Sequence, residues 1–231
     1  GAKVYDATTL QPMVLSNWHI FVGSPTAVPG EPIWQPGPLD GGGTADTFAT
    51  LSRFVLGPHD AAVAELNNTR QVLTETVEGD ALEDVTVPQL GMLVWKSGRT
   101  TERTTGFIDG VQMATSVNYG AAGLRLMQQV FRVVPRPGVG NVEVSMGGDS
   151  GAIWVDEASG KGVGLHFAGE VGNAPEHALA HELQPVLTLL NVLLPAQLPA
   201  PPEPATVPTV PPEPPSGDDE LPLTPDRKSV V

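Results

Sequence analysis

Short apolar runs, each ended by glycine, proline or polar residues, constrain this chain more than any other feature. The runs are Met13–Leu15, Phe54–Leu56, Met92–Trp95, Gln129–Val134 and Gly151–Val155. Runs this short, with turns between them, are typical of strands in an all-β sandwich or barrel. The 231 residues suffice for one large all-β domain or for two small lobes that share a core.

Two segments depart from this pattern. Residues 24–43 are rich in Gly and Pro and predict a long surface loop. In residues 176–194, apolar residues recur at spacings of three and four, which predicts a helix with one apolar face. The apolar positions are Leu179, Leu183, Val186, Leu187 and Leu190. Pro185 lies inside the segment and predicts a kink or a division into two pieces.

The segment 196–231 differs in composition from everything before it. It holds eleven prolines, few aliphatic residues and no aromatic residue. Such a segment buries too little apolar surface to fold, so we expect a disordered, Pro-rich tail. A solvated linker and a ligand for a proline-binding partner are both compatible with this composition.

Charge and cysteine content limit the classes of function. The formal net charge of −14 disfavours nucleic acid and anionic membranes as partners. The chain has no cysteine, so disulfides and thiolate metal sites are excluded. No apolar stretch reaches the length of a membrane span. No signal segment is visible after Gly1, so the compartment stays open, with the cytoplasm favoured.

The segment Met146–Ala152, with the sequence MGGDSGA, carries the strongest chemical signal. A serine hydroxyl becomes a nucleophile when a base removes its proton, and the reaction needs donors for the oxyanion that forms. Glycines on both sides of Ser150 allow a tight turn that exposes several N–H groups. On its own, the tetrapeptide GDSG of residues 148–151 would also fit an ordinary turn.

Two further segments supply a base and an acid. His19 follows an apolar run in LSNWHI, and Asp60 opens the apolar run DAAVAEL. Taken separately, His19 fits a half-buried structural histidine, and Asp60 fits a turn. Asp40 and Asp46 are lower-ranked alternatives for the acid, because no apolar run follows them.

Taken together, the three motifs in the order His, Asp, Ser resemble those of the trypsin/chymotrypsin family of serine proteases, and most closely its Cys-free bacterial members. The resemblance extends over residues 1–194. Met92 to Gly110 resembles the opening hairpin of the family's second barrel, and Gly164 to Gly169 resembles the strand that lines its substrate cleft.

The resemblance implies an all-β fold of two six-stranded antiparallel barrels, followed here by the C-terminal helix and the tail. Residues 1–86 would form the first barrel, with His19 and Asp60, and residues 87–195 the second, with Ser150 and the helix. The first barrel would lack its first strand, because little sequence precedes the His19 motif. The start also lacks the Ile-Val-Gly-Gly segment that pairs with the aspartate before the serine in animal members, which argues against a cleavage-activated switch through Asp149.

The resemblance also implies roles for the residues. Ser150 attacks the peptide carbonyl, His19 transfers the proton, and Asp60 orients the imidazole. The N–H groups of Gly148 and Ser150 would form the oxyanion hole. No metal or organic cofactor is implied. The residues that would bind substrate are Val144, His166, Phe167 and Ala168.

Substrate preference is a separate expectation. Val144 lies six residues before Ser150, where trypsin carries its specificity aspartate, so basic specificity is not expected. The stretch Gly164–His166 resembles one in glutamate- and glutamine-cleaving relatives, and an imidazole can donate a hydrogen bond to such a side chain. A small or medium apolar side chain is the alternative, with His166 then serving only packing.

Other polar residues receive structural interpretations. His177 and His181 have the spacing of a metal pair on a helix, but no third ligand is evident, so ordinary helix positions are favoured. His59 is expected in a loop or on the barrel surface. Lys96, Arg99 and Arg103 are expected on the exposed face of a hairpin.

Three functions fit the sequence. The first is an active serine endopeptidase that acts on a protein or peptide substrate through an acyl-enzyme. The second is a latent or inactive protease-like module that binds partners. The third is a domain that cleaves its own polyprotein within the adjoining tail. The complete set of His19, Asp60 and Ser150 favours chemistry over binding alone.

Overall fold

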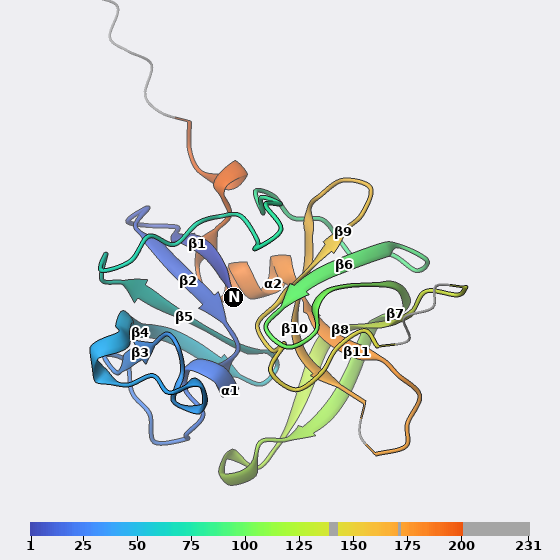
Figure 1. Cartoon of the computed structure of the whole chain (residues 1–231), viewed down its shortest axis with the longest axis horizontal. Helices are drawn as coiled ribbons and strands as arrows, with labels where there is room; N and C mark the ends of the chain where they lie inside the picture. Colours follow the sequence, from blue (N-terminus) through green and yellow to red (C-terminus); the bar gives the residue numbers. More distant parts are fainter. Residues whose placement is uncertain (139–142, 171, 201–231) are drawn as a thin grey trace, which may run out of the picture. The chain divides into compact units, whose positions relative to one another are not determined.

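Two antiparallel sheets of six strands each are formed within residues 1–138, 143–170 and 172–200, which the computed structural model describes (Figure 1). The first sheet has the order β12-β1-β2-β5-β4-β3, and the second closes into a barrel in the order β10-β11-β8-β7-β6-β9. The Pro-rich segment 201–231 lies outside the described residues.

The first sheet is centred on β5, a strand of small residues. Its strands are β1 (Ala2–Asp6), β2 (Pro12–Ser16), β3 (Pro32–Trp34), β4 (Thr47–Leu56), β5 (Asp60–Leu66) and β12 (Val192–Leu193). In β5, residues 60–64 are all buried, because the strand lies between β2 and β4 and both of its faces are covered. Ala61 and Val63 pack in one apolar cluster, and Ala62 and Ala64 pack in another. Asp60 occupies the first position of this central strand.

The sixth strand of the first sheet comes from the far end of the chain. β12 pairs with β1 through Leu193 opposite Tyr5 and Val192 opposite Asp6. The sequence predicted a first barrel that lacks a strand, whereas β12 brings this sheet to six strands. The segment 24–43 also differs from a plain loop, because β3 and the 3-10 helix η1 (Pro38–Asp40) lie within it.

The second sheet carries the hairpins on either side of the loop that contains Ser150. Its strands are β6 (Leu93–Gly98), β7 (Glu102–Asn118), β8 (Leu124–Pro135), β9 (Ile153–Asp156), β10 (Gly162–Gly169) and β11 (Ala178–Glu182). β6 and β7 form the hairpin predicted over residues 92–110. The hairpin of β7 and β8 is longer and ends in Tyr119 and the 3-10 helix η3 (Gly120–Ala122).

The predicted helix over residues 176–194 is wrong in its first part. Residues 178–182 form β11, which pairs with β8 and β10, and the helix α2 (Leu183–Leu189) begins after it. Pro185 lies in the first turn of α2, where its missing N–H breaks no helical hydrogen bond. The predicted apolar face is present from Leu183 onward, because Leu183, Leu187 and Leu190 are buried.

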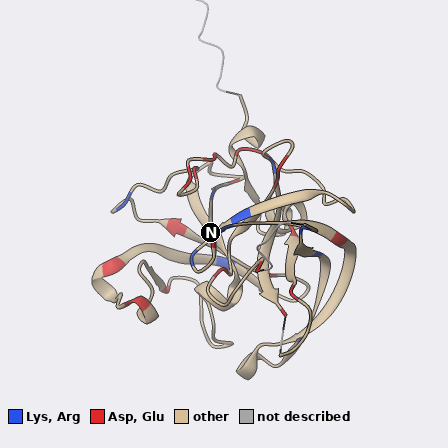
Figure 2. Ribbon diagram, turned by 45° about the vertical axis from the view of Figure 1, so that its right-hand side comes forward, with Lys and Arg blue, Asp and Glu red and all other residues tan. Residues whose placement is uncertain are grey.

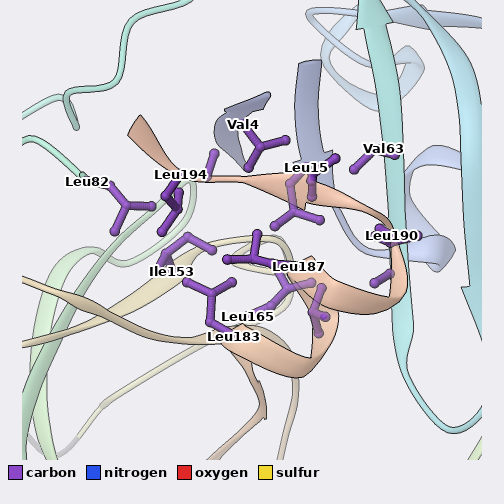
Figure 3. Packing of buried hydrophobic residues seen from close by; sticks show 14 of the residues in the cluster. Val4, Leu15, Val63, Leu82, Ile153, Leu165, Leu183, Leu187, Leu190 and Leu194 are labelled. Atoms are coloured by element: carbon purple, nitrogen blue, oxygen red, sulfur yellow. The ribbon is translucent and has the colours of Figure 1, made fainter. Parts of the chain in front are cut away.

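A single apolar cluster joins the first sheet to α2 and to β9 and β10 (Figure 3). Val4, Leu15 and Val63 of the first sheet pack against Leu187 and Leu165 in this cluster. The cluster fixes the position of the His19 segment relative to the second sheet, because β2 leads directly into α1 (Trp18–Phe21). A four-residue helix of this kind has little stability of its own and depends on such packing.

Candidate active site

His19 and Asp60 form a hydrogen-bonded pair at the first sheet. Asp60 Oδ2 lies 2.5 Å from His19 Nδ1, and Asp60 Oδ1 accepts the backbone N–H of His19 at 3.1 Å. The Asp60 side chain is fully buried, whereas that of His19 is 28% exposed. One carboxylate thus fixes both the backbone and the ring of the histidine, and leaves Nε2 of His19 for another partner.

The carboxylate of Asp60 has a further donor from the second lobe. The hydroxyl of Tyr119, at the tip of the hairpin of β7 and β8, donates to Asp60 Oδ2 at 2.8 Å. Burial and the adjacent charge of Asp60 raise the pKa of Tyr119 well above its ordinary value, so this hydroxyl stays a donor. The Tyr119 ring meets Trp18 edge-on, with ring centroids 6.0 Å apart.

The backbone of Asp60 is held as firmly as its side chain. Asn17 donates its side-chain N–H to the carbonyl of Asp60 at 2.9 Å. The N–H of Asp60 donates to His181 Nε2 at 3.0 Å, so His181 is an acceptor at this nitrogen. Burial lowers the pKa of His181 to about 3, which keeps the ring neutral and able to accept this bond.

The structure places the two alternative acids elsewhere. Asp40 pairs with Arg99, and Asp46 pairs with Arg70 at 3.4 Å. Asp60, and neither alternative, contacts His19 within the described part of the chain.

The segment around Ser150 forms the tight turn that its glycines predict. Gly148 and Gly151 have φ of 107° and 91°, a region that other residues rarely adopt. A Cβ at Gly151 would overlap Ser16 Oγ, so the turn lies directly against the end of β2, three residues before His19. Ser150 is partly exposed and lines a cavity of about 470 Å³ together with Ile20 and Phe21, the residues that follow His19.

The two N–H groups predicted for the oxyanion hole, those of Gly148 and Ser150, donate to no protein acceptor within the described residues. The neighbouring Gly151 N–H and Ala152 N–H, by contrast, donate to His166 and Asp149 carbonyls at 3.0 and 2.9 Å. Donors left open beside an exposed hydroxyl can stabilise a developing negative charge.

The carboxylate of Asp149, the residue before Ser150, accepts several hydrogen bonds. It accepts hydrogen bonds from the N–H groups of Thr100, Thr101 and Met146 at 2.8, 3.1 and 3.0 Å. It also accepts the Thr101 hydroxyl at 2.6 Å. Burial alone would raise the pKa of Asp149, but the bond from Thr101 and the backbone donors bring it below its ordinary value.

Lys96 is the counter-ion of Asp149, and the predicted exposed position for it is wrong. Both side chains are fully buried, with Nζ 3.1 Å from Oδ2. Burial lowers the pKa of Lys96, and the charge of Asp149 opposes that effect. Arg99 and Arg103 do lie on the surface, as predicted for the hairpin. An internal ammonium group thus occupies the place next to Asp149.

Four residues were predicted to bind substrate. Val144 is buried, and its N–H donates to Glu176 Oε1 at 2.8 Å. Phe167 is buried and stacks on His181 at 4.1 Å, and Ala168 is half-buried beside it. His166 is 3% exposed, and burial lowers its pKa to about 3, so it is neutral at pH 7.

The remaining histidines differ in part from their predicted positions. His181 lies on strand β11, not on a helix, and accepts the Asp60 N–H. His177 is half-buried in the segment before β11, and its Nδ1 contacts the Pro175 carbonyl at 2.8 Å. His59 lies in the turn between β4 and β5, one of the two positions expected for it, but its side chain is buried, with 3% exposed and its ring centroid 4.9 Å from that of His181.

The fold matches those of solved bacterial serine proteases. A Nocardiopsis protease superimposes with a TM-score of 0.59 over 84% of this chain and 90% of that chain, at 17% identity. A glutamic acid-specific serine protease that uses a histidine triad in substrate binding superimposes with a TM-score of 0.59 over 84% of this chain and 97% of that chain, at 14% identity. A Cellulomonas bogoriensis chymotrypsin superimposes with a TM-score of 0.53 over 84% of this chain and 96% of that chain, at 17% identity.

The fold is chymotrypsin-like. The predicted fold class, two six-stranded antiparallel β lobes, is confirmed at this level. No family model matches the sequence, and no curated protein shows significant similarity to it. At such identities the likeness shows the fold, and its neighbours are peptidases.

Sequence reasoning missed three residues of the site. Lys96 reads as a surface charge in a hairpin, Tyr119 stands in a glycine-rich turn, and Glu176 precedes the predicted helix face. The one signal that could have found Tyr119 is an aromatic residue in an otherwise polar hairpin tip.

Proposed function

We propose that this chain is a serine endopeptidase that cleaves peptide bonds of protein or peptide substrates through His19, Asp60 and Ser150. The observation that carries the proposal is the 2.5 Å hydrogen bond between His19 and Asp60, two residues 41 positions apart. The glycine turn of Ser150 lies against Ser16, three residues before His19. The protease fold of the neighbours supports the same reaction class.

In this mechanism Ser150 Oγ attacks the substrate carbonyl while His19 Nε2 takes the hydroxyl proton. Asp60 accepts the Nδ1–H of His19 and stabilises the imidazolium that results. The N–H groups of Gly148 and Ser150 donate to the oxyanion of the tetrahedral intermediate. His19 then protonates the leaving amine, and water hydrolyses the acyl-enzyme by the reverse sequence of proton transfers.

A fluorophosphonate probe and a peptide-hydrolysis assay test the proposal together. The full chain is expected to label at Ser150 and to cleave peptides, and Ser150→Ala is expected to lose labelling and about 10⁶-fold in turnover. Ser159→Ala, at an exposed serine outside the site, serves as the matched control. A folded wild-type chain that does not label would contradict the proposal and favour the inactive binding module instead.

A further inference from the structure

Three glutamates from separate segments converge beside the nucleophile loop. Glu143, Glu170 and Glu176 each bring one carboxylate oxygen to within 4.8 Å of the other two. Acidic residues are scattered over both lobes (Figure 2), so a cluster alone has little meaning in a chain with net charge −14. The bonding of this cluster distinguishes it.

Glu176 is held in place by the chain that leads to Ser150. The N–H groups of Val144 and Ser145 donate to Glu176 Oε1 at 2.8 and 3.3 Å. Burial raises the pKa of Glu176, the two donors oppose this, and repulsion from Glu170 and Glu143 adds to it. No Lys or Arg of the described residues forms an ion pair with Glu170 or Glu176, so this charge lacks a neutralising partner there.

An unpartnered buried hydroxyl is the second, independent observation. Ser145 is 2% exposed, and its Oγ has no hydrogen-bond partner among the described residues. This Oγ lies 3.2 Å from the place a Cβ of Gly169 would take, and the His177 carbonyl lies 3.3 Å from the same place. It therefore lies between the segment that carries Glu170 and the one that carries Glu176. Glu170 Oε2 is likewise buried without a partner.

These open acceptors require a ligand that donates. A Lys ammonium has three N–H donors and an Arg guanidinium has five, and both carry a positive charge of the kind that forms no ion pair with Glu170 or Glu176 among the described residues. A carboxylate or an apolar side chain could neither satisfy these oxygens nor offset their charge.

The cluster is also continuous with the loop that contains Ser150. His166 of β10 exchanges backbone hydrogen bonds with Gly151 and Ala152, directly after Ser150. Glu170 follows the last residue of β10, and Ser145 lies five residues before Ser150. Both walls of the cluster are therefore continuous with the loop of the nucleophile.

We propose that Glu170 and Glu176, together with Glu143, bind the side chain that precedes the scissile bond and select Lys or Arg. This inference rests on the proposed peptidase function. It differs from the sequence-based expectation of Glu or Gln, because the converging carboxylates of the cluster would repel an acidic side chain. The acid missing at Val144 is supplied by Glu176, which the N–H of Val144 binds.

A set of fluorogenic peptides that differ only in this residue tests the inference on the full chain. We expect kcat/KM for Arg and Lys to exceed that for Gln, Leu and Glu. Glu176→Gln and, separately, Glu170→Gln should each lower the Arg-to-Gln ratio by about 10- to 100-fold, as expected for lost bonds to a charged group. Glu65→Gln, at an exposed acid of the first sheet, should leave the ratio unchanged.

Two measurements separate the possible failures. If Ser150 labels with fluorophosphonate but the enzyme prefers Glu, Gln or Leu, the inference is wrong and the proposed function stands. If Ser150 does not label, the proposed function fails first. A Ca²⁺-dependent rise in melting temperature that Glu176→Gln removes, with no change in side-chain preference, would show a metal site and overturn the inference. Glu170→Lys gives a further check, because it should favour peptides with Glu.

Discussion

The two halves of the candidate site are built in opposite ways. In the half that holds His19 and Asp60, the Asp60 side chain itself is held by hydrogen bonds. It accepts them from the ring and the backbone N–H of His19 and from the hydroxyl of Tyr119. In the other half, the N–H groups of Gly148 and Ser150 have no protein acceptor among the described residues, whereas the neighbouring Asp149 carboxylate accepts several hydrogen bonds.

This difference matches what each half would do in the proposed mechanism. An acid that only orients a base works best when it does not move, so buried hydrogen bonds on Asp60 serve it directly. A nucleophile and an oxyanion hole must keep their groups open for substrate, so the rigidity of the Ser150 loop has to come from the neighbouring residue Asp149. The pair of Lys96 and Asp149 supplies it without occupying the reacting groups.

The largest expected effect tests the acid of the bonded half. Asp60→Asn should lower kcat by about 10⁴-fold, because an amide favours the wrong tautomer of His19. Asp40→Asn, at the surface partner of Arg99, is the control and should stay near wild type in the same peptide assay. The reverse result would assign the acid to Asp40.

Lys96→Met tests the anchoring of the open half. It leaves Asp149 buried without its counter-ion, so the free energy of unfolding should fall by about 3–5 kcal/mol in urea denaturation. Lys161→Met removes a cation that is 45% exposed and should change it by at most about 1 kcal/mol. Equal effects of the two variants would mean that the buried pair does not anchor the loop.

A pH series compares the buried histidines behind the two halves. Burial holds the pKa of His166 and His181 at about 3, below the ordinary value near 6.5. Below pH 6.5 the unfolded chain binds more protons, so stability present above that pH is lost as pH falls. The two histidines together should remove about 2 kcal/mol between pH 6.5 and 5.5.

Urea midpoints at the two pH values measure this loss. His166→Gln and His181→Gln should each reduce this loss by about half, whereas Ser159→Ala, at an exposed position, should leave it unchanged. A loss that neither buried substitution alters would assign the pH dependence to other groups.

The smallest expected effect concerns the bond between the lobes. Tyr119→Phe removes the hydroxyl that donates to Asp60 and should lower kcat/KM by about tenfold, with little change in the unfolding midpoint. Tyr5→Phe, on β1, is the matched control. Unchanged kcat/KM in Tyr119→Phe would show that the ring and the backbone N–H of His19 orient the Asp60 carboxylate sufficiently.

The sequence was most informative where a local pattern decides the structure. The short apolar runs predicted the β fold, and the run after Asp60 placed this residue at the start of a strand. The pattern misled where tertiary pairing overrode it, since residues 178–182 have helical spacing but find strand partners in β8 and β10.

Charged residues were the other source of error. Lys96 looks like any hairpin lysine until the position of Asp149 is known, and Glu176 has no local signal because its partners lie at residues 144 and 145. Long-range pairs of this kind depend on how loops meet in the folded chain, which spacing along the sequence does not encode. The oxyanion, nucleophile and substrate roles predicted from the sequence stay predictions until the experiments above are done.

The pairing of β12 with β1 has a consequence for the order of events during synthesis. Within the described residues, the edge of β1 away from β2 pairs with β12, so this pairing forms only after residues 192–193 have left the ribosome. Leu190, Val192 and Leu194 complete the apolar cluster that supports β2 and the His19 segment. His19 and Asp60 are translated early but reach their final support late. A nascent chain thus completes the packing around His19 and Asp60 only after the strands of its second sheet have been made.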